Sequence, residues 1–188
     1  MTMTLEAPPP NRLTAVDLLA MPDGERYELV EGALLEREMG TLASWVGGEV
    51  FAQLRDYGRA TGVGWAFPAD AGYQCFADDG DRVRRPDASF VCRGRFPDER
   101  FPQGHTRLVP DLTVEVVSPN DYYSEVRAKT DEYLSAGVRC VWVLDPRTRT
   151  VEVRRPGGSA VLTAADELTA EDVLPGFHCP VADFFPPG

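Results

Sequence analysis

An acidic residue lies inside a segment that otherwise has the pattern of a buried β-strand. Residues 112–117 are Leu-Thr-Val-Glu-Val-Val, with Glu115 among β-branched and apolar neighbours. Burying an unpaired carboxylate costs several kcal/mol or forces its neutralisation. A second carboxylate, Asp87, opens another strand candidate after Arg84-Arg85-Pro86. Two carboxylates on adjacent strands repel unless a cation lies between them, and hard oxygen ligands suit Mg²⁺ or Mn²⁺. The pair therefore indicates a divalent-metal site.

The basic residues of the chain consist of eighteen arginines and one lysine, Lys129. Lys129 lies in the helix predicted directly after the Glu115 strand, so it can reach the end of that strand. An ammonium group there can hold an attacking water or stabilise charge on a phosphate. Alternatively, Lys129 is a solvated helix residue paired with Glu125, which lies four residues earlier on the same helix face.

The elements that must position these residues follow from the periodicity of the chain. Alternation predicts that Thr113, Glu115 and Val117 share one strand face. A helix is predicted over 121–136, ended by Gly137, and residues 138–146 form an apolar strand that we expect at the centre of a sheet. We further expect a capped helix after Thr14, a hairpin over 26–38, a helix over 41–62, strands at 63–67, 71–76 and 86–93, an irregular loop over 94–110, a hairpin over 150–164, and a strand with a helical turn over 174–185.

Length and composition set the class of protein. The 188 residues suit one domain, which we place at 13–188 after a disordered arm at 1–12. The net charge of −11 lacks the basic footprint of a protein with broad duplex DNA contacts. No apolar run is long enough for a membrane span, and four cysteines outside any C-x-x-C pair indicate reduced thiols. We therefore expect a cytoplasmic protein that does not enter the membrane.

Three ordered segments resemble a known family. "RPDASFV", "LTVEVVSP" and "SEVRAKTDEYLSAGVRCVWVLDP" are similar to sequences of the Uma-two family, which belongs to the PD-(D/E)XK, restriction-endonuclease-like nuclease superfamily. "RYELVEGALLE" near the start and "LPGF" near the end extend the resemblance from about Thr14 to Phe185. In the superfamily pattern, lysine follows the acid by two residues, a position that Val117 occupies here. In the Uma-type pattern it lies on the next helix, where Lys129 falls.

The resemblance implies a fold, a reaction and a set of site residues. The fold would be an α/β restriction-endonuclease-like core, a mixed central sheet flanked by helices with an N-terminal hairpin and a C-terminal β-rich extension. The reaction would be Mg²⁺- or Mn²⁺-dependent hydrolysis of phosphodiester bonds in nucleic acid, with DNA as the expected substrate. By analogy such a nuclease acts as a homodimer. Catalytic residues would be Asp87, Glu115 and Lys129; Asp87, Glu115 and the main-chain carbonyl of Val116 would bind metal, with Glu49 and Glu125 as accessory acids.

Less specific interpretations remain open for the same residues. Glu115 could pair with a core arginine, and Asp87 could simply begin a strand. Glu28, Glu31 and Glu49 are expected to be ordinary surface acids, and His105 an ordinary loop residue. Tyr122, Tyr123 and Tyr133 are expected to pack on the helix. The alternative function is a catalytically inactive nuclease-fold protein that binds or regulates within a larger assembly. The acidic net charge favours this alternative. So does the absence of histidine from residues 40–50, since Uma-type sequences commonly carry a histidine in this early helix.

Overall fold

The computed structural model describes residues 12–37, 40–119 and 121–187, so the predicted arm lies almost entirely outside the described residues. The elements are, in order, α1 (Ala15–Ala20), η1 (Gly24–Arg26), β1 (Tyr27–Val30), β2 (Ala33–Glu36), α2 (Thr41–Thr61), β3 (Gly64–Pro68), β4 (Ala88–Cys92), η2 (Pro97–Glu99), β5 (Leu112–Val116), α3 (Tyr123–Ala136), β6 (Cys140–Asp145), β7 (Thr150–Arg155), β8 (Gly158–Thr163), β9 (Glu167–Ala170), β10 (Leu174–Pro180) and η3 (Val181–Phe184).

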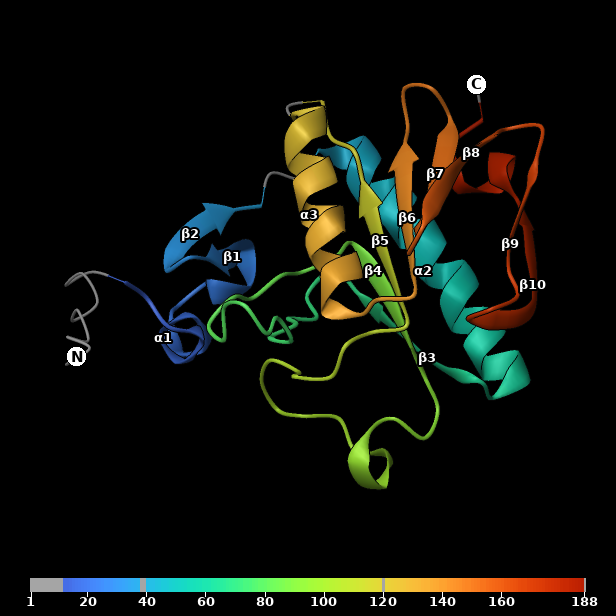
Figure 1. Cartoon of the computed structure of the whole chain (residues 1–188). Helices are drawn as coiled ribbons and strands as arrows, with labels where there is room; N and C mark the ends of the chain where they lie inside the picture. Colours follow the sequence, from blue (N-terminus) through green and yellow to red (C-terminus); the bar gives the residue numbers. More distant parts are fainter. Residues whose placement is uncertain (1–11, 38–39, 120, 188) are drawn as a thin grey trace.

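Six of the strands form one mixed sheet in the order β3-β4-β5-β6-β7-β8. All neighbours are antiparallel except β5 and β6, which run parallel and are joined through α3. Helix α3 covers one face of this sheet, while α2 and the small β9–β10 sheet lie on the other (Figure 1). The predicted α/β architecture with a mixed central sheet is confirmed, including the internal position of β6.

The two faces of the sheet follow from strand alternation. On β5, Leu112, Val114 and Val116 belong to the core beneath α2. On β6, Trp142 and Leu144 join the same core, whereas Val141 belongs to a smaller cluster with α3. Glu115 lies between Val114 and Val116 in the strand, so it is directed to the α3 face. The predicted alternation therefore places the strand carboxylate opposite the main hydrophobic core.

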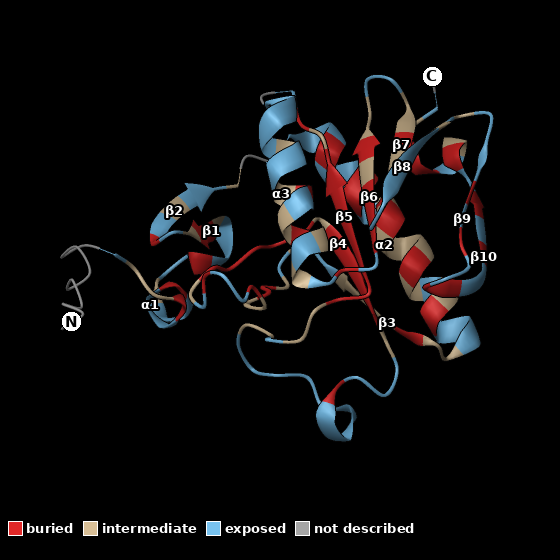
Figure 2. Ribbon diagram, viewed as in Figure 1, coloured by how far each residue is buried: buried red, intermediate tan, exposed pale blue. Residues whose placement is uncertain are grey.

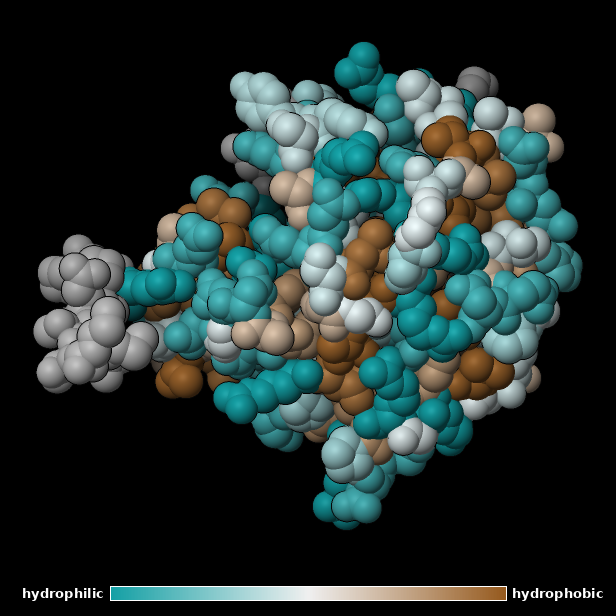
Figure 3. Space-filling model, viewed as in Figure 1, coloured by the Kyte–Doolittle hydropathy of each residue, from teal (hydrophilic) through white to brown (hydrophobic). Residues whose placement is uncertain are grey.

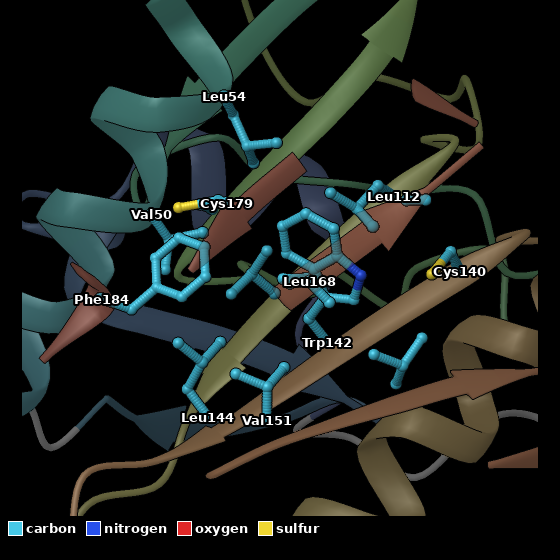
Figure 4. Close-up of a cluster of buried hydrophobic side chains, with 14 of the residues drawn as sticks. Val50, Leu54, Leu112, Cys140, Trp142, Leu144, Val151, Leu168, Cys179 and Phe184 are labelled. Carbon is cyan, nitrogen blue, oxygen red and sulfur yellow. The ribbon is translucent and has the colours of Figure 1, made fainter. Parts of the chain in front are cut away.

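The core beneath α2 is the larger of the apolar clusters. Val50 and Leu54 of α2 pack there against the β6 residues and against Leu168, Cys179 and Phe184 of the C-terminal segment (Figure 4). Buried residues form a nearly continuous layer through β4, β5 and β6, while the outer side of α3 is exposed (Figure 2). All four cysteines are free thiols, and Cys140 and Cys179 are buried.

The N-terminal hairpin begins from a well-capped helix. Thr14 and Asp17 form a reciprocal capping box at the start of α1. Strands β1 and β2 pair tightly around Glu31 and Gly32, which both have positive φ, as the two-residue turn of such a hairpin requires. The main chains of Leu29 and Val83 exchange two N–H···O=C hydrogen bonds, which fix the hairpin against the segment before β4.

Two sequence expectations about secondary structure are corrected. Residues 71–76 do not form a strand, because Tyr73 makes only isolated bridges, to Arg84 and to Thr106. Helix α3 begins at Tyr123 rather than at 121, since Asp121 accepts a hydrogen bond from the Ser118 amide and forms a turn before the helix.

The tyrosines of α3 are divided between core and surface. Tyr133 is fully buried, as predicted, but Tyr122 and Tyr123 are 71% and 69% exposed, so their assignment as packing residues is wrong. Tyr122 is the N-cap of α3 and Tyr123 is its first residue, so both lie at the end of the helix that points to the top of Figure 1. None of the helices in the described ranges is long and apolar enough to cross a membrane.

Candidate active site

The candidate active site is a pocket of about 490 Å³ at the end of β5. Four segments form its walls: the β1–β2 hairpin, the residues leading into β4, the end of β5, and the first half of α3. Asp87, Glu115 and Lys129 all line it, as do Glu28 and Arg37. The three side chains named from the sequence therefore share one pocket.

Lys129 lies between two buried carboxylates. Its Nζ is 2.8 Å from Glu115 Oε2 and 2.9 Å from Glu28 Oε1. Among the described residues, it forms no ion pair with Glu125, so the interpretation of a solvated Lys129–Glu125 pair is wrong. Lys129 is one turn before Tyr133 on α3, and this spacing directs both side chains to the sheet. The lysine is thereby aimed at the end of β5.

Glu28 is a central residue of this cluster, although its sequence position suggested a surface acid. Its side chain is only 6% exposed. Besides Lys129, it accepts hydrogen bonds from the Arg84 guanidinium at 2.8 Å and from the Arg85 main-chain N–H at 2.7 Å. Arg84 in turn makes two hydrogen bonds to Glu132, at 2.8 and 2.9 Å. The hairpin thus contributes a second anion, besides Glu115, that holds the lysine.

Glu115 has both carboxylate oxygens engaged. Oε2 accepts from Lys129, and Oε1 accepts from the Tyr133 hydroxyl at 2.9 Å. The core-arginine interpretation of Glu115 is therefore wrong, because its cationic partner is Lys129. The hydroxyl and the ammonium together hold the carboxylate in one orientation in the wall of the pocket.

Asp87 lies where the β4–β5 ladder ends. Its Oδ2 accepts a hydrogen bond from the Val116 amide at 2.7 Å, and its Oδ1 is 3.5 Å from a guanidinium nitrogen of Arg37. Helix α2 approaches closely on the other side, since a Cβ added at Gly47 would stand 3.5 Å from the Asp87 Cβ. Asp87 therefore both completes the strand pairing and presents a carboxylate to the pocket.

The burial of these groups alters their proton affinities. Burial raises the pKa of Glu115 to about 7; Lys129 opposes this rise, and Asp87 and Glu28 add to it. Burial also raises the pKa of Asp87, although Lys129 again opposes the change. For Glu28, burial is outweighed by Lys129 and Arg84, which lower its pKa to about 2.

The lysine itself stays protonated. Burial alone would lower the pKa of Lys129, but the carboxylates of Glu115, Glu28 and Asp87 outweigh burial and raise it. Lys129 therefore acts as a fixed positive charge rather than as a base. Tyr133 likewise stays neutral, because burial and the Glu115 charge raise its pKa.

The two accessory acids occupy different places. Glu125 lines the pocket but is exposed. Glu49 is half-buried on α2 and is not among the pocket residues. Sequence reasoning missed Glu28 and Arg37, which line the same pocket. No signal for Glu28 was available in the sequence, because its position in β1 has the alternation expected of a surface acid and only the structure shows that it is buried.

The donor chemistry of the pocket fits a hard divalent cation. No group of three or more His, Cys, Asp or Glu side chains arranged to hold a metal occurs in the described part of the chain. Mg²⁺, however, is commonly held by one or two carboxylates, with water and substrate phosphates completing its shell. Asp87 and Glu115 supply two such carboxylates where β5 ends. Burial raises the pKa of both, and a cation bound nearby would lower both pKa values again.

Comparison with known proteins places this geometry in a family. Residues 15–182 match the Uma2 family, described as "Putative restriction endonuclease", so the chain belongs to that family. A crystal structure of a "putative nuclease belonging to DUF820" from Anabaena variabilis superposes with a TM-score of 0.75 and 23% sequence identity, covering 92% of this chain and 97% of that one. None of the curated proteins compared with the chain matches it. Family and fold together support a nuclease.

Proposed function

We propose that the protein is a metal-dependent endonuclease that hydrolyses phosphodiester bonds of DNA. The observation that carries this proposal is the Lys129 ammonium, which contacts both Glu115 and Glu28 in the pocket that Asp87 also lines. A half-buried lysine held by two buried carboxylates beside a third is costly to assemble, and such clusters of perturbed groups are frequent at functional sites. Membership of the family and the nuclease fold support the same assignment.

The two carboxylates and the lysine would have separate roles. Asp87 and Glu115, with the main-chain carbonyl of Val116, would hold Mg²⁺ or Mn²⁺, which supplies Lewis-acid stabilisation of negative charge on a phosphate. Lys129 would orient the attacking water and stabilise charge on the phosphate oxygens, because its ammonium stays protonated. Tyr133 would keep the Glu115 carboxylate in place through its hydroxyl.

Glu28 would act as a positioning residue. It contacts Lys129 from the hairpin, while Arg84 and the Arg85 amide hold its own carboxylate. A charge fixed in this way needs no reorganisation during the reaction, which is the main advantage of a preorganised site. Arg37 lines the same pocket and adds a second cation on the side of Asp87.

A second candidate function is an inactive nuclease-fold protein that binds or regulates within an assembly. The observation that favours it is the full engagement of Glu115, whose two oxygens are bonded to Lys129 and Tyr133. The net charge of −11 favours it as well, since it opposes contact with a polyanion. This candidate predicts no cleavage with any divalent metal.

Metal-dependent nicking of a supercoiled plasmid separates the two functions. We expect cleavage by the wild type with Mg²⁺ or Mn²⁺ and none with EDTA. Lys129→Ala should lower the rate by about 10²–10³-fold, which is typical for loss of a positioned charge. Lys129→Arg should rescue poorly, because a planar guanidinium replaces a compact ammonium.

The matched control is Arg55→Ala, which removes one cation from an exposed pair with Asp56 outside the pocket. Its nicking rate should equal that of the wild type. A Lys129→Ala protein that cuts as fast as this control would contradict the role given to the lysine. A wild type that never cuts would favour the binding protein.

A further inference from the structure

A second hollow continues from the candidate active site around the first turn of α3. It has a volume of about 380 Å³ and lies between α3 and strands β6, β7 and β8; we call it the α3–β8 groove. Asp121 and Val126 line both this groove and the active-site pocket. The two hollows therefore adjoin at these residues, so the groove lies next to the candidate active site.

The groove is lined by three acids and three arginines, and two of the arginines have no acidic partner among the described residues. Arg127 and Arg147 line it, are exposed, and form no ion pair with any residue that the structure describes. Asp145, by contrast, accepts hydrogen bonds from the Arg147 and Thr148 amides. Two arginines thus remain available for an external phosphate in a chain whose net charge is −11.

The other acids of the groove are also engaged within the protein. Asp121 accepts a hydrogen bond from the Ser118 amide, and Glu152 pairs with Arg154 at 3.7 Å. Arg154 is further held by Asp131 and by the Thr130 hydroxyl. Hydrogen bonds from main-chain amides leave the charges of Asp121 and Asp145 in place, so the acids and the arginines of the groove balance, and the two unpaired arginines are the groups free to bind a phosphate.

The remaining surface of the groove is apolar and aromatic. Val143 and Val161 contribute to its lining, and Val161 is 63% exposed on the edge strand β8. Tyr123 stands beside them with 69% of its surface exposed. Hydrophobic surface is visible between the mostly hydrophilic residues of α3 and the β7–β8 hairpin (Figure 3). An exposed aromatic ring beside apolar surface is suited to stacking with a flat ring.

We propose that the α3–β8 groove binds unpaired nucleotides of the strand that flanks the scissile phosphate. Tyr123 would stack on a base, while Arg127 and Arg147 would contact phosphates. This proposal rests on the proposed nuclease function, since it extends the same site. It makes single-stranded DNA, or a duplex with an unpaired segment, the preferred substrate.

The preference for an unpaired strand follows from the charge of this surface and from its exposed aromatic ring. Proteins that bind duplex DNA broadly carry a basic footprint, whereas this chain has a net charge of −11 and offers two unpaired arginines in one groove. A base can stack on a side chain only after it has left the duplex stack. A groove with one exposed aromatic ring and two cations is therefore suited to bind a strand whose bases are already unpaired.

The test compares binding of fluorescein-labelled single-stranded DNA of 15 nucleotides with binding of the matching duplex, by fluorescence anisotropy in EDTA. We expect the wild type to bind the single strand at least about 10-fold more tightly. Tyr123→Ala should weaken single-strand binding by roughly 5- to 150-fold, as expected for a lost stacking platform, and Tyr123→Phe should restore it. Each lost arginine contact should reduce the salt slope by about 0.7, so Arg127→Ala with Arg147→Ala should reduce it by about 1.4.

The matched control is the double variant Arg59→Ala with Arg100→Ala, which removes two exposed arginines from outside the groove. It should bind like the wild type. Equal single-strand affinity for the groove variants and this control, or tighter binding of the duplex, would overturn the proposal. Plasmid nicking, measured in parallel, reports on the nuclease function separately. If the wild type cuts and the groove variants bind single strands and cut as well as the wild type does, the groove proposal is refuted while the nuclease function stands. Loss of binding in the groove variants supports the groove even if nothing is cut.

Discussion

The two faces of the central sheet are made by the same strands but have opposite chemistry. Beneath α2, residues such as Trp142 and Leu144 are fully buried in an apolar cluster. Beneath α3, the neighbouring positions carry Glu115, which meets Lys129 and Tyr133. The two central strands of one sheet therefore contribute to the largest core on one face, and β5 contributes to the candidate active site on the other.

This difference shows how the protein can tolerate a costly cluster of charges. Removing ions from water costs several kcal/mol each even after relaxation, and an ion pair recovers that cost only with good geometry. The apolar face supplies hydrophobic stabilisation that does not depend on pH or metal. We expect the α2 face to determine stability and the α3 face to determine how stability responds to pH and to cations.

The largest expected effect comes from breaking the apolar face. Trp142→Ala should lower the free energy of unfolding by about 3–5 kcal/mol, because Trp142 is fully buried against Phe177 and Phe184. Urea unfolding at several pH values would measure it. The loss should be the same at each pH, since no titratable group of the site is touched. A loss that varied with pH would show that the two faces are not independent.

The next effect comes from removing one charge of the opposite face. Glu28→Gln keeps the shape but leaves Lys129 and Arg84 with one carboxylate fewer, and it should cost about 1.5–3 kcal/mol, as for hydrogen bonds to charged groups. The nicking rate should also fall, because the lysine loses one of its two anchors. Asp56→Asn is the control, since its exposed pair with Arg55 should contribute at most about 0.5 kcal/mol. Equal stability of the two variants would contradict the role of Glu28.

The fold was largely predictable because alternation and helix periodicity are local properties. The order of most helices and strands along the chain, the buried centre at β6 and the position of Glu115 on one face all follow from side-chain spacing, whereas the strand order within the sheet comes from the structure. The proximity of Lys129 to Glu115 was also accessible, because a helix that follows a strand packs back on it. Residues 71–76 were mispredicted because their apolar pattern serves isolated bridges rather than a ladder.

The partners of the site residues were less predictable. Lys129 shares a helix face with Glu125, and only the packing of α3 on the sheet shows that it turns inward to Glu115 and Glu28. Glu28 alternates with apolar residues like any surface acid, and the second layer that buries it comes from α3 and the Arg84 segment, far away in sequence. The metal-binding and catalytic roles of Asp87, Glu115 and Lys129, and the homodimer, stay predictions.

The pH dependence of stability sharpens the contrast in a metal-free protein. Glu28 has a folded pKa of about 2 against an ordinary value of 4.5, so its stabilisation is present above pH 4.5 and is lost as the pH falls toward 2. Glu115 has a folded pKa of about 7 against 4.5, so the folded state holds a proton that the unfolded state releases. Stability should therefore fall as the pH rises from 4.5 to 7.

The measurement compares the wild type with Glu115→Gln in EDTA at pH values from 4.5 to 7.5. The free energy of unfolding of the wild type should decline relative to that of the variant by about 1–3 kcal/mol over this window. Mn²⁺ should then offset the decline above pH 7, because it binds the native state. A difference between the two proteins that stays constant with pH would show that Glu115 is not perturbed in this way.

The smallest effect tests the one residue that belongs to both kinds of environment. The Tyr133 ring packs beside Phe76, and its hydroxyl donates to Glu115 at 2.9 Å. Tyr133→Phe keeps the ring and removes the donor, so the unfolding free energy should fall by only about 1 kcal/mol. The Glu115 carboxylate, however, loses a hydrogen bond that favours its charged form, and Mn²⁺ affinity should fall by about 10-fold or more.

The matched control is Tyr57→Phe, which makes the same change on the other face, where the Tyr57 hydroxyl donates to the Pro175 carbonyl at 2.9 Å. It should leave Mn²⁺ affinity unchanged. Isothermal titration would measure the Mn²⁺ affinity of both variants. If the two affinities were equal, the Tyr133 hydroxyl would have no part in metal binding, and Lys129 alone would orient the Glu115 carboxylate.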